Sequence, residues 1–215
     1  NNKEYSNIKK VNYNIAMFFK DLNNKNLDDI KLFPEYMDFL NLSSSEYLNY
    51  RYKVDDTLFY EILNIENMGE YNKTLVKIKC KYENKEGTSF KVFSLEDEFI
   101  LDEPFLFVKD IGEAVDYKDI IFSVEGKAIF NDKAIYKIII KNNGKETFFI
   151  DDDKYGFHAT QEKNKYYHTL EFGDITSYRI HPGTEKTLFI GFNNLKGMAD
   201  VYININGRNL LLTSN

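Results

Sequence analysis

Residues Ala134 to Ile150 read AIYKIIIKNNGKETFFI, two densely apolar runs separated by Asn142, Asn143 and Gly144. Isoleucine, phenylalanine and tyrosine suit a pleated, half-buried surface, whereas asparagine and glycine tolerate the positive φ that a tight turn requires. The stretch therefore predicts a β-hairpin. It indicates the architecture of the second half of the chain and carries no chemistry of its own.

No helical period appears in this half of the chain. Strand-like runs follow one another at the short spacing of an all-β sandwich, and Asn206-Gly207 is the strongest hairpin signal among their turns. The expected strands cover residues 120–130, 134–140, 146–150, 155–159, 166–170, 187–192, 201–205 and 210–213. We therefore expect a β-sandwich over residues 120–215.

The order of motifs in this half resembles a known family. The motifs are YKIIIKNNGKETFFIDDDKYGF at 136–157, IHPGTEKTLFIGF at 180–192 and VYINI at 201–205. They are similar to the DUF4352-like immunoglobulin-like domain of Gram-positive bacterial lipoproteins, in which a Pro-Gly-Glu turn precedes an apolar strand. Pro182, Gly183 and Glu185 fall at that turn, with Thr184 inserted. The resemblance implies an extracytoplasmic immunoglobulin-like domain that has no catalytic centre and accompanies other domains.

The first half opens with a helical pattern. Apolar residues recur at helical spacing from Val11 to Leu22, which predicts an amphipathic helix followed by shorter helical pieces. The segment LVKIKCKY at 75–82 then alternates cleanly, and strand-like runs continue to Val108. Helices followed by a twisted antiparallel sheet predict an α+β domain over residues 10–112.

This order of elements resembles the cone-shaped NTF2-like fold found in bacterial surface proteins. The likeness is carried by a helix with the aromatic pair Phe18 and Phe19, the loop LNNKNLDDI at 22–30 and a closing aromatic run, DEPFLFVKDI at 102–111. Many relatives have a tryptophan in that last strand, where this chain has phenylalanines. The resemblance implies a cone, with any pocket at its mouth or floor.

Acid–base chemistry in such a cone would fall to carboxylates and tyrosines, because all three histidines lie in the second half. Burial in a pocket can shift the pKa of such groups toward neutrality. The candidate pocket residues are Asp55, Tyr60, Tyr82, Glu96 and Glu98, together with Asp56. These residue types are common on any surface. The chain also has no nucleophile elbow, phosphate loop or dinucleotide fingerprint, so we assign no catalytic residue and no cofactor.

Three features invite a metal or thiol interpretation without meeting its requirements. The aspartates at 151–153 lack the spacing and final Glu of a calcium loop, which is typical of a solvated turn. His158 and His168 could meet across a sheet but have no fixed third ligand. Cys80 is the single cysteine, so no intrachain disulfide forms, and its apolar surroundings predict a small core residue. No metal site is expected.

Lys73, Lys77, Lys79, Lys81 and Lys85 form a basic stripe along one expected strand. Lysines on the wet face of an antiparallel strand keep it soluble and discourage edge pairing. The functional alternative is attraction to an acidic partner, such as a wall polymer or another protein.

Charge and composition bound the class of partner. The 34 acidic and 28 basic residues give a net charge of -6, which argues against nucleic acid and anionic membranes as partners. No run approaches the roughly 20 apolar residues that span a bilayer, so the chain as given is expected to be soluble. It begins at Asn1 rather than Met, so we expect an upstream part, and the polar tether at 1–9 would suit a preceding signal peptide or anchor. A trimmed cytoplasmic protein explains the same opening as well. Residues 113–119 are the expected linker.

The sequence thus predicts a non-enzymatic, extracytoplasmic binding or assembly protein of a Gram-positive bacterium, membrane-anchored in its full-length form, with a protein or cell-envelope partner. One alternative is a small-molecule-binding, hydrolase or isomerase pocket in the cone. Another is a carbohydrate-binding sandwich with a coplanar row of exposed tyrosines. For the leading hypothesis, the tyrosines that would supply contact area where they are exposed are Tyr47, Tyr50, Tyr52, Tyr155, Tyr166, Tyr167 and Tyr178.

Overall fold

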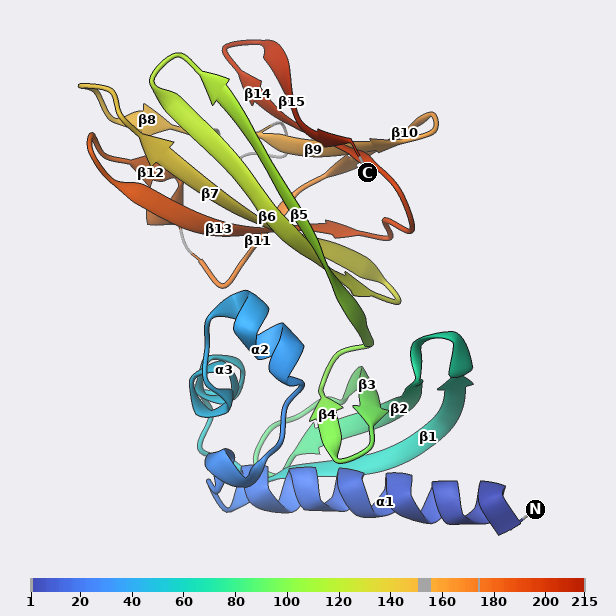
Figure 1. Cartoon of the computed structure of the whole chain (residues 1–215). Coiled ribbons are helices and arrows are strands. Elements are labelled where there is room, and N and C mark those ends of the chain that lie inside the picture. Colours follow the sequence, from blue (N-terminus) through green and yellow to red (C-terminus); the bar gives the residue numbers. More distant parts are fainter. Residues whose placement is uncertain (1, 151–155, 174, 215) are drawn as a thin grey trace. The chain divides into compact units, whose positions relative to one another are not determined.

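The computed structural model of the chain describes residues 2–150, 156–173 and 175–214 (Figure 1). The chain divides into two compact units, of which the first ends at Phe107 and the second begins at Val108. The described part is mostly β, with 51% strand against 22% helix.

Helices begin the first unit. The α-helices are α1 (Asn2–Asn23), α2 (Pro34–Leu40) and α3 (Ser44–Arg51). A short 3-10 helix, η1 (Leu27–Asp29), lies between α1 and α2, and another, η2 (Gly69–Tyr71), lies between β1 and β2. The apolar stripe predicted from the sequence is the buried face of α1, and the helix continues through the residues expected as a polar tether. Ser43 and Glu46 start α3 with reciprocal hydrogen bonds between side chain and backbone, which satisfy two N–H groups at the helix start.

A four-stranded antiparallel sheet completes this unit. Its strands are β1 (Leu58–Met68), β2 (Lys73–Tyr82), β3 (Ser89–Glu96) and β4 (Phe99–Leu101), and they lie side by side in chain order. The alternation predicted for β2 is confirmed, because Val76, Ile78 and Cys80 are buried on one face. Figure 1 shows α1 lying along the sheet, and the Phe19 ring of α1 stacks on Tyr60 of β1.

The second unit is built from strands. A five-stranded sheet has the order β11-β13-β7-β6-β5, a four-stranded sheet the order β10-β9-β14-β15, and β12 pairs with β8. The strands are β5 (Phe105–Tyr117), β6 (Ile120–Phe130), β7 (Lys133–Asn142), β8 (Phe148–Phe149), β9 (Phe157–Gln161), β10 (Asn164–Tyr167), β11 (Thr169–Glu171), β12 (Arg179–Ile180), β13 (Glu185–Asn193), β14 (Asp200–Ile205) and β15 (Arg208–Ser214), with η3 at Ile175–Tyr178. The two larger sheets share one hydrophobic core, to which Ile138 and Ile190 contribute from one sheet and Val201 and Ile203 from the other.

The predicted fold class, an NTF2-like cone followed by an immunoglobulin-like sandwich, is wrong. The run at Phe105–Val108, expected to close the cone, instead begins β5, which pairs with β6 in a different sheet. The first sheet therefore ends with the three-residue β4. In the second unit β5, β6 and β7 are successive neighbours in one sheet, whereas an immunoglobulin domain sends its third strand to the opposite sheet. The expected linker residues up to Tyr117 belong to β5.

The hairpin predicted at 134–150 does not form. Both edges of β7 are occupied, by β6 on one side and β13 on the other, and the second run contributes only β8, which pairs with β12. Asn142 explains the difference, because its side-chain amide donates to the carbonyls of Glu146 and Ile180 and so directs the chain away from β7. The hairpin predicted at Asn206-Gly207 is confirmed between β14 and β15, with φ of 51° and 79° at its two turn residues.

Candidate functional site

The residues predicted to line a pocket do not converge. Tyr60 packs on α1, where its ring centroid lies 4.3 Å from that of Phe19. Asp55 is exposed and lies 3.8 Å from the ammonium of Lys25. Glu98 borders a depression beside α1 that neither Tyr60 nor Asp55 lines.

The other two candidates lie elsewhere in the first unit. Glu96 pairs with the buried ammonium of Lys73 at 2.9 Å, at the end of β3. Tyr82 lines a small pocket at the opposite end of the sheet, where Asp56 accepts hydrogen bonds from the backbone and side chain of Asn84. The five residues therefore form no common acid–base site.

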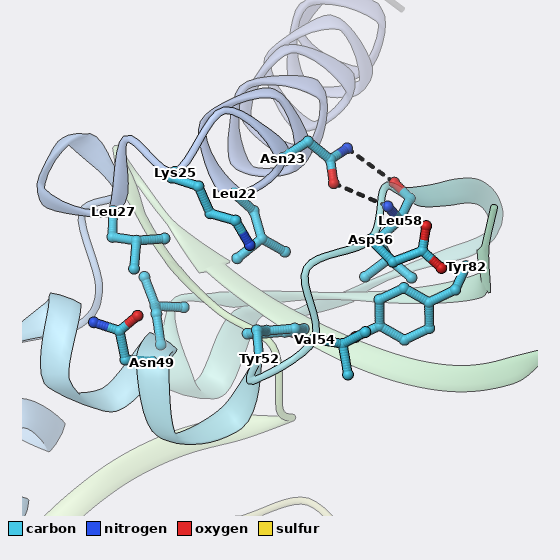
Figure 2. Close-up of a pocket in the computed structure, with 11 residues that line it drawn as sticks. Leu22, Asn23, Lys25, Leu27, Asn49, Tyr52, Val54, Asp56, Leu58 and Tyr82 are labelled. Carbon is cyan, nitrogen blue, oxygen red and sulfur yellow. Dashed lines mark hydrogen bonds between the residues drawn. The ribbon is translucent and has the colours of Figure 1, made fainter. Parts of the chain in front are cut away.

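The pocket at Tyr82 is too small for a substrate (Figure 2). It lies between the end of α1, the end of α3 and the start of β1, and its volume of about 20 Å³ suits one water molecule. Burial, with smaller contributions from Cys80 and Asp56, raises the pKa of Tyr82. The hydroxyl therefore stays protonated at neutral pH and is no ready base.

Aromatic side chains fill the interior where the cone predicted a cavity. Phe93 of β3 lies with its ring centroid 5.0 Å from that of Phe18 and 5.7 Å from that of Phe19. All three are at most 2% exposed, and Val76 and Ile78 of β2 are fully buried beside them on the same sheet face. This packing fills the space around Phe93, and a hollow of about 510 Å³ lies further along α1, between Asn14 and the sheet residues Thr74 and Glu96.

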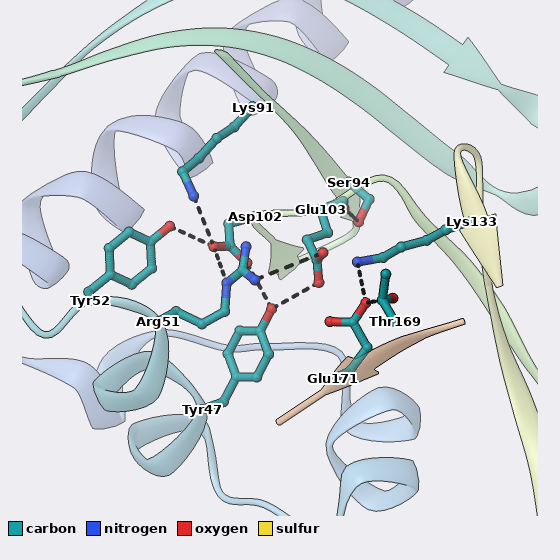
Figure 3. Close-up of polar contacts among 10 residues, drawn as sticks. All are labelled: Tyr47, Arg51, Tyr52, Lys91, Ser94, Asp102, Glu103, Lys133, Thr169 and Glu171. Carbon is teal, nitrogen blue, oxygen red and sulfur yellow. Dashed lines mark hydrogen bonds and ion pairs between the residues drawn. The ribbon is translucent and has the colours of Figure 1, made fainter. Parts of the chain in front are cut away.

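A buried ionic cluster surrounds Asp102 (Figure 3). Its carboxylate accepts hydrogen bonds from the hydroxyl of Tyr52 at 2.6 Å, the hydroxyl of Tyr47 at 3.0 Å and Nε of Arg51 at 3.0 Å. The ammonium of Lys91 lies 3.7 Å away. Tyr47 and Arg51 project from one face of α3, since residues four apart in a helix share a face. The cluster thus ties α3 to β3 and to the segment after β4.

The charges of the cluster set its pKa values. Burial alone would raise the pKa of Asp102, but Arg51, Lys91 and the two tyrosine hydroxyls outweigh it and lower that pKa. Burial, reinforced by the Asp102 charge, raises the pKa values of Tyr47 and Tyr52 well above 10. The resting state is an ionised carboxylate held by neutral phenols and cations.

Glu103 extends the same cluster. Its carboxylate accepts a hydrogen bond from Tyr47 at 3.3 Å and lies 3.9 Å from Nη1 of Arg51, while its backbone carbonyl accepts from Ser94 at 2.8 Å. The Asp102 side chain is 0% exposed, so no substrate reaches it. Sequence reasoning missed this cluster. Its signal was two adjacent carboxylates after a buried strand, LDEP at 101–104, which alone does not name the partners in α3.

The structure assigns the histidines to ordinary contacts. His158 stacks on Tyr202, and burial lowers its pKa. Nδ1 of His168 either accepts from the Phe157 N–H at 3.2 Å or donates to the Phe157 carbonyl at 3.0 Å, according to its tautomer, and Nε2 lies 3.1 Å from the hydroxyl of Tyr178. Within residues 2–150, 156–173 and 175–214, no three His, Cys, Asp or Glu side chains are grouped to hold a metal ion. The aspartates at 151–153 lie outside the described residues.

The expected tyrosine contact surface is not a single row. Tyr47 and Tyr178 are buried, Tyr52 and Tyr166 are half-buried, and Tyr50 and Tyr167 are exposed; Tyr155 lies outside the described residues. Tyr47 and Tyr52 are committed to Asp102, and Tyr178 to His168. The described residues thus give no support to a carbohydrate platform made by these side chains.

The solvent face of the first sheet carries an unusual set of side chains. In the register of the sheet Phe59 lies opposite Lys81, and Lys79 lies opposite Phe90, while Lys77 follows on β2. Phe59 is 53% exposed and Phe90 60% exposed. The ammonium of Lys77 lies 5.6 Å from the ring centre of Phe90, within cation–π range. We call these five residues the lysine face.

The basic stripe expected from the sequence is thereby divided. Lys77, Lys79 and Lys81 lie on the lysine face, but Lys73 is buried against the rings of Phe33 and Phe105 and pairs with Glu96. The start of β2 thus contributes a lysine to the core, whereas the rest of the strand contributes lysines to the lysine face. Lys73 is part of the core, Lys77 and Lys81 are exposed and Lys79 is half-buried, while the exposed Lys85 follows the end of β2.

Comparisons with known proteins give no family. No family model matches the chain, and no curated protein matches it. Among solved structures, a crystal structure of a functionally unknown protein from Listeria monocytogenes EGD-e has 10% sequence identity and a TM-score of 0.40, covering 50% of this chain and 84% of that one. A likeness at this level says nothing about function. No helix in the described part of the chain is long and apolar enough to cross a membrane.

Proposed function

We propose that this chain is a binding or assembly protein without catalytic activity, and that a macromolecular partner docks on the lysine face. The observation that carries the proposal is the exposure of Phe59 and Phe90 among three lysines, on a sheet whose other face is tightly packed. Exposed aromatic side chains at the centre of a surface are typical of protein interfaces, where they supply large contact areas.

The interior of the first unit supports the same choice over an enzyme. Catalytic sites bring titratable groups to a pocket that admits a substrate. Here the ionised cluster at Asp102 is closed, the pocket at Tyr82 has a volume of about 20 Å³, and in the larger hollow beside α1 the carboxylate of Glu96 is paired with Lys73. The location of the protein outside the cytoplasm is part of the proposal, and fractionation of cells that express the full-length gene tests it.

Site-specific photo-crosslinking tests the binding function. A benzophenone amino acid replaces Phe90 in the full chain within living cells, and the matched control places it at Tyr13, an equally exposed residue of α1. We expect a discrete adduct from position 90 and none from position 13. The adduct should disappear in the Lys79→Glu/Lys81→Glu variant and persist in Lys3→Glu/Lys9→Glu, which changes the charge of α1 equally. Equal adducts at both positions, or none at position 90, would refute the proposal.

A further inference from the structure

The two edges of the first sheet differ. At β4 the edge is covered, because Leu32 bridges to Ile100 and the Ile100 N–H donates to the carbonyl of Lys31 at 3.0 Å. At β1, no strand pairs with the outer edge in the described part of the chain. An exposed strand edge is a template for pairing with another chain. The edge at β1 is therefore the open one.

The hydrogen bonds at the start of β1 show which backbone groups face outward. The Leu58 N–H donates to Oδ1 of Asn23 at 2.9 Å, and Nδ2 of Asn23 donates to the Leu58 carbonyl at 3.0 Å (Figure 2). The carbonyl of Thr57, by contrast, accepts from the Glu83 N–H on the side of β2. Because backbone direction alternates along a strand, the N–H and C=O groups of Tyr60 and Ile62 also point outward.

Asn23 thus occupies the edge as a single peptide group of a neighbouring strand would. Its amide shows that the outer edge of β1 has the geometry for strand pairing, and that the pairing is satisfied only at Leu58. A bulge between Ile62 and Asn64 marks the end of the regular segment, with Leu63 exposed at that point. The free segment next to Asn23 therefore runs from Phe59 to Ile62.

The charged side chains near the edge of β1 favour one class of binding partner over others. Lys79 and Lys81 lie one strand inward on the solvent face. Glu61 of β1 itself lies opposite Lys79 and offsets one charge, so the three lysines leave the face with a net positive charge. The face is basic although the whole chain carries a net charge of -6, so a partner with carboxylates is favoured over a neutral or basic one. A second copy of the chain would bring like lysine faces together, which costs free energy.

Resting on the proposed function, we infer that β1 binds an extended acidic segment of a protein partner by strand addition. The segment pairs with the backbone of Tyr60 and Ile62. Its apolar side chains cover Phe59, and its carboxylates reach Lys79 and Lys81. Adjacent strands lie about 4.8 Å apart, so an added strand lies about 10 Å from β2, a separation that a lysine and a carboxylate side chain span together. Main-chain pairing gives affinity in this mode of recognition, and side chains give specificity.

Selection of random displayed peptides on the full chain is the first test. We expect enrichment of peptides that carry an apolar residue and an Asp or Glu two positions apart, because residues i and i+2 of a strand face the same side. A synthetic peptide from that pool should bind the Lys79→Glu/Lys81→Glu variant at least about tenfold more weakly, which corresponds to about 1.4 kcal/mol. Its affinity for the Lys3→Glu/Lys9→Glu control, which changes the net charge equally, should not change. Enrichment without acidic residues, or equal loss in both variants, overturns the inference.

The backbone component is tested on the peptide, so that the protein stays unaltered. Two peptides are compared, one N-methylated at its odd positions and the other at its even positions. In one of them the methyl groups replace the N–H donors that face β1, and in the other those donors are kept. We expect one methylated peptide to lose binding and the other to keep it. Equal affinity of both peptides excludes strand addition.

If the partner is a second copy of the chain or a membrane, the inference is wrong, and a separate measurement detects each case. Sedimentation of the full chain would show a dimer that the Phe90→Thr variant loses if the partner is a second copy. Vesicles containing phosphatidylglycerol would bind the chain but not the Lys79→Glu/Lys81→Glu variant if the partner is a membrane. A photo-crosslinked protein adduct at position 90 without any acidic peptide preference would leave the binding function standing and refute the acidic strand alone.

Discussion

Asn23, the last residue of α1, forms two hydrogen bonds with the backbone of Leu58, the first residue of β1, at 2.9 and 3.0 Å. One side-chain amide thereby fixes the end of a helix to the start of a strand 35 residues later. It also fills the first position on an edge that is otherwise open. In the sequence Asn23 looks like an asparagine that ends a helix, whereas in the structure its side chain connects α1 to β1.

The Asn23→Ala variant should lower the free energy of unfolding by about 1–3 kcal/mol, because Leu58 loses both partners in a half-buried place. Urea denaturation of the full chain measures the change. Asn24→Ala, one residue further on at an exposed position, is the control and should have little effect. Equal stability of both variants would show that water replaces the amide at no cost.

The Asp102→Asn variant should destabilise the protein by about 3–5 kcal/mol, because Arg51 and Lys91 lose the carboxylate that compensates their charge. The exposed Asp55→Asn is the matched control, since it removes the same charge at the surface. Denaturant midpoints at neutral pH measure both. A loss as small in Asp102→Asn as in Asp55→Asn would contradict a buried ionic cluster.

The pH dependence of stability should report the same carboxylate. The pKa of Asp102 is lower in the folded protein than in the unfolded chain, where the pKa of an aspartate is about 3.9. The unfolded state therefore binds the proton first, so the contribution of Asp102 is present above about pH 4 and is lost as the pH falls through the folded pKa. Denaturation of Asp102→Asn should show a shallower acid decline than the parent chain. Parallel declines would contradict the assignment.

The Phe90→Thr and Phe93→Ala variants separate the two faces of β3. Phe90 is 60% exposed and Phe93 is fully buried, because residues three positions apart in a strand face opposite sides of the sheet. Thr keeps the β-propensity of the site, so Phe90→Thr and Phe59→Thr should change the unfolding free energy by no more than about 0.5 kcal/mol. Phe93→Ala should cost about 3–5 kcal/mol. A large loss in Phe90→Thr would mean that the lysine face is covered in the folded chain.

Gly126 in β6 should not tolerate a side chain. A Cβ atom there would lie 2.8 Å from the backbone carbonyl oxygen of Lys109, at the bulge between Val124 and Gly126. We expect Gly126→Ala to destabilise the protein by about 1–3 kcal/mol, since backbone must move. Gly69→Ala is the control, because a Cβ there meets nothing within 4 Å. Thermal unfolding midpoints of the two variants measure the difference. Equal midpoints would contradict the close approach of the Lys109 carbonyl oxygen to Gly126.

Local patterns in the sequence predicted several elements for physical reasons that survive in the structure. The apolar stripe of α1 and the alternation of β2 are confirmed because one-sided burial imposes a period on each element. The Asn206-Gly207 turn is confirmed because both residues adopt positive φ at little cost. Strand partners were not predictable in this way. The hairpin expected at 134–150 failed because β7 already has β6 and β13 as neighbours.

The candidate site shows the same division. Residue type alone made Tyr82 and Glu96 equal candidates for acid–base chemistry, but Tyr82 lines a water-sized pocket and Glu96 pairs with Lys73. It treated five lysines as one stripe, but the buried rings of Phe33 and Phe105 take Lys73 out of it. The meaning of a common residue type depends on its neighbours in space, which composition does not contain.

By itself the sequence determined a chain with a true core, an amphipathic first helix, a second half made of strands and the alternation that puts three lysines on one side of β2. Only the tertiary structure decided that Asp102 is an enclosed ion held by α3, that β1 is an open edge, and that Phe59 and Phe90 share the lysine face. The reason is physical. Period and propensity act between residues close in sequence, whereas burial, ion pairing and strand order depend on contacts between residues far apart in sequence.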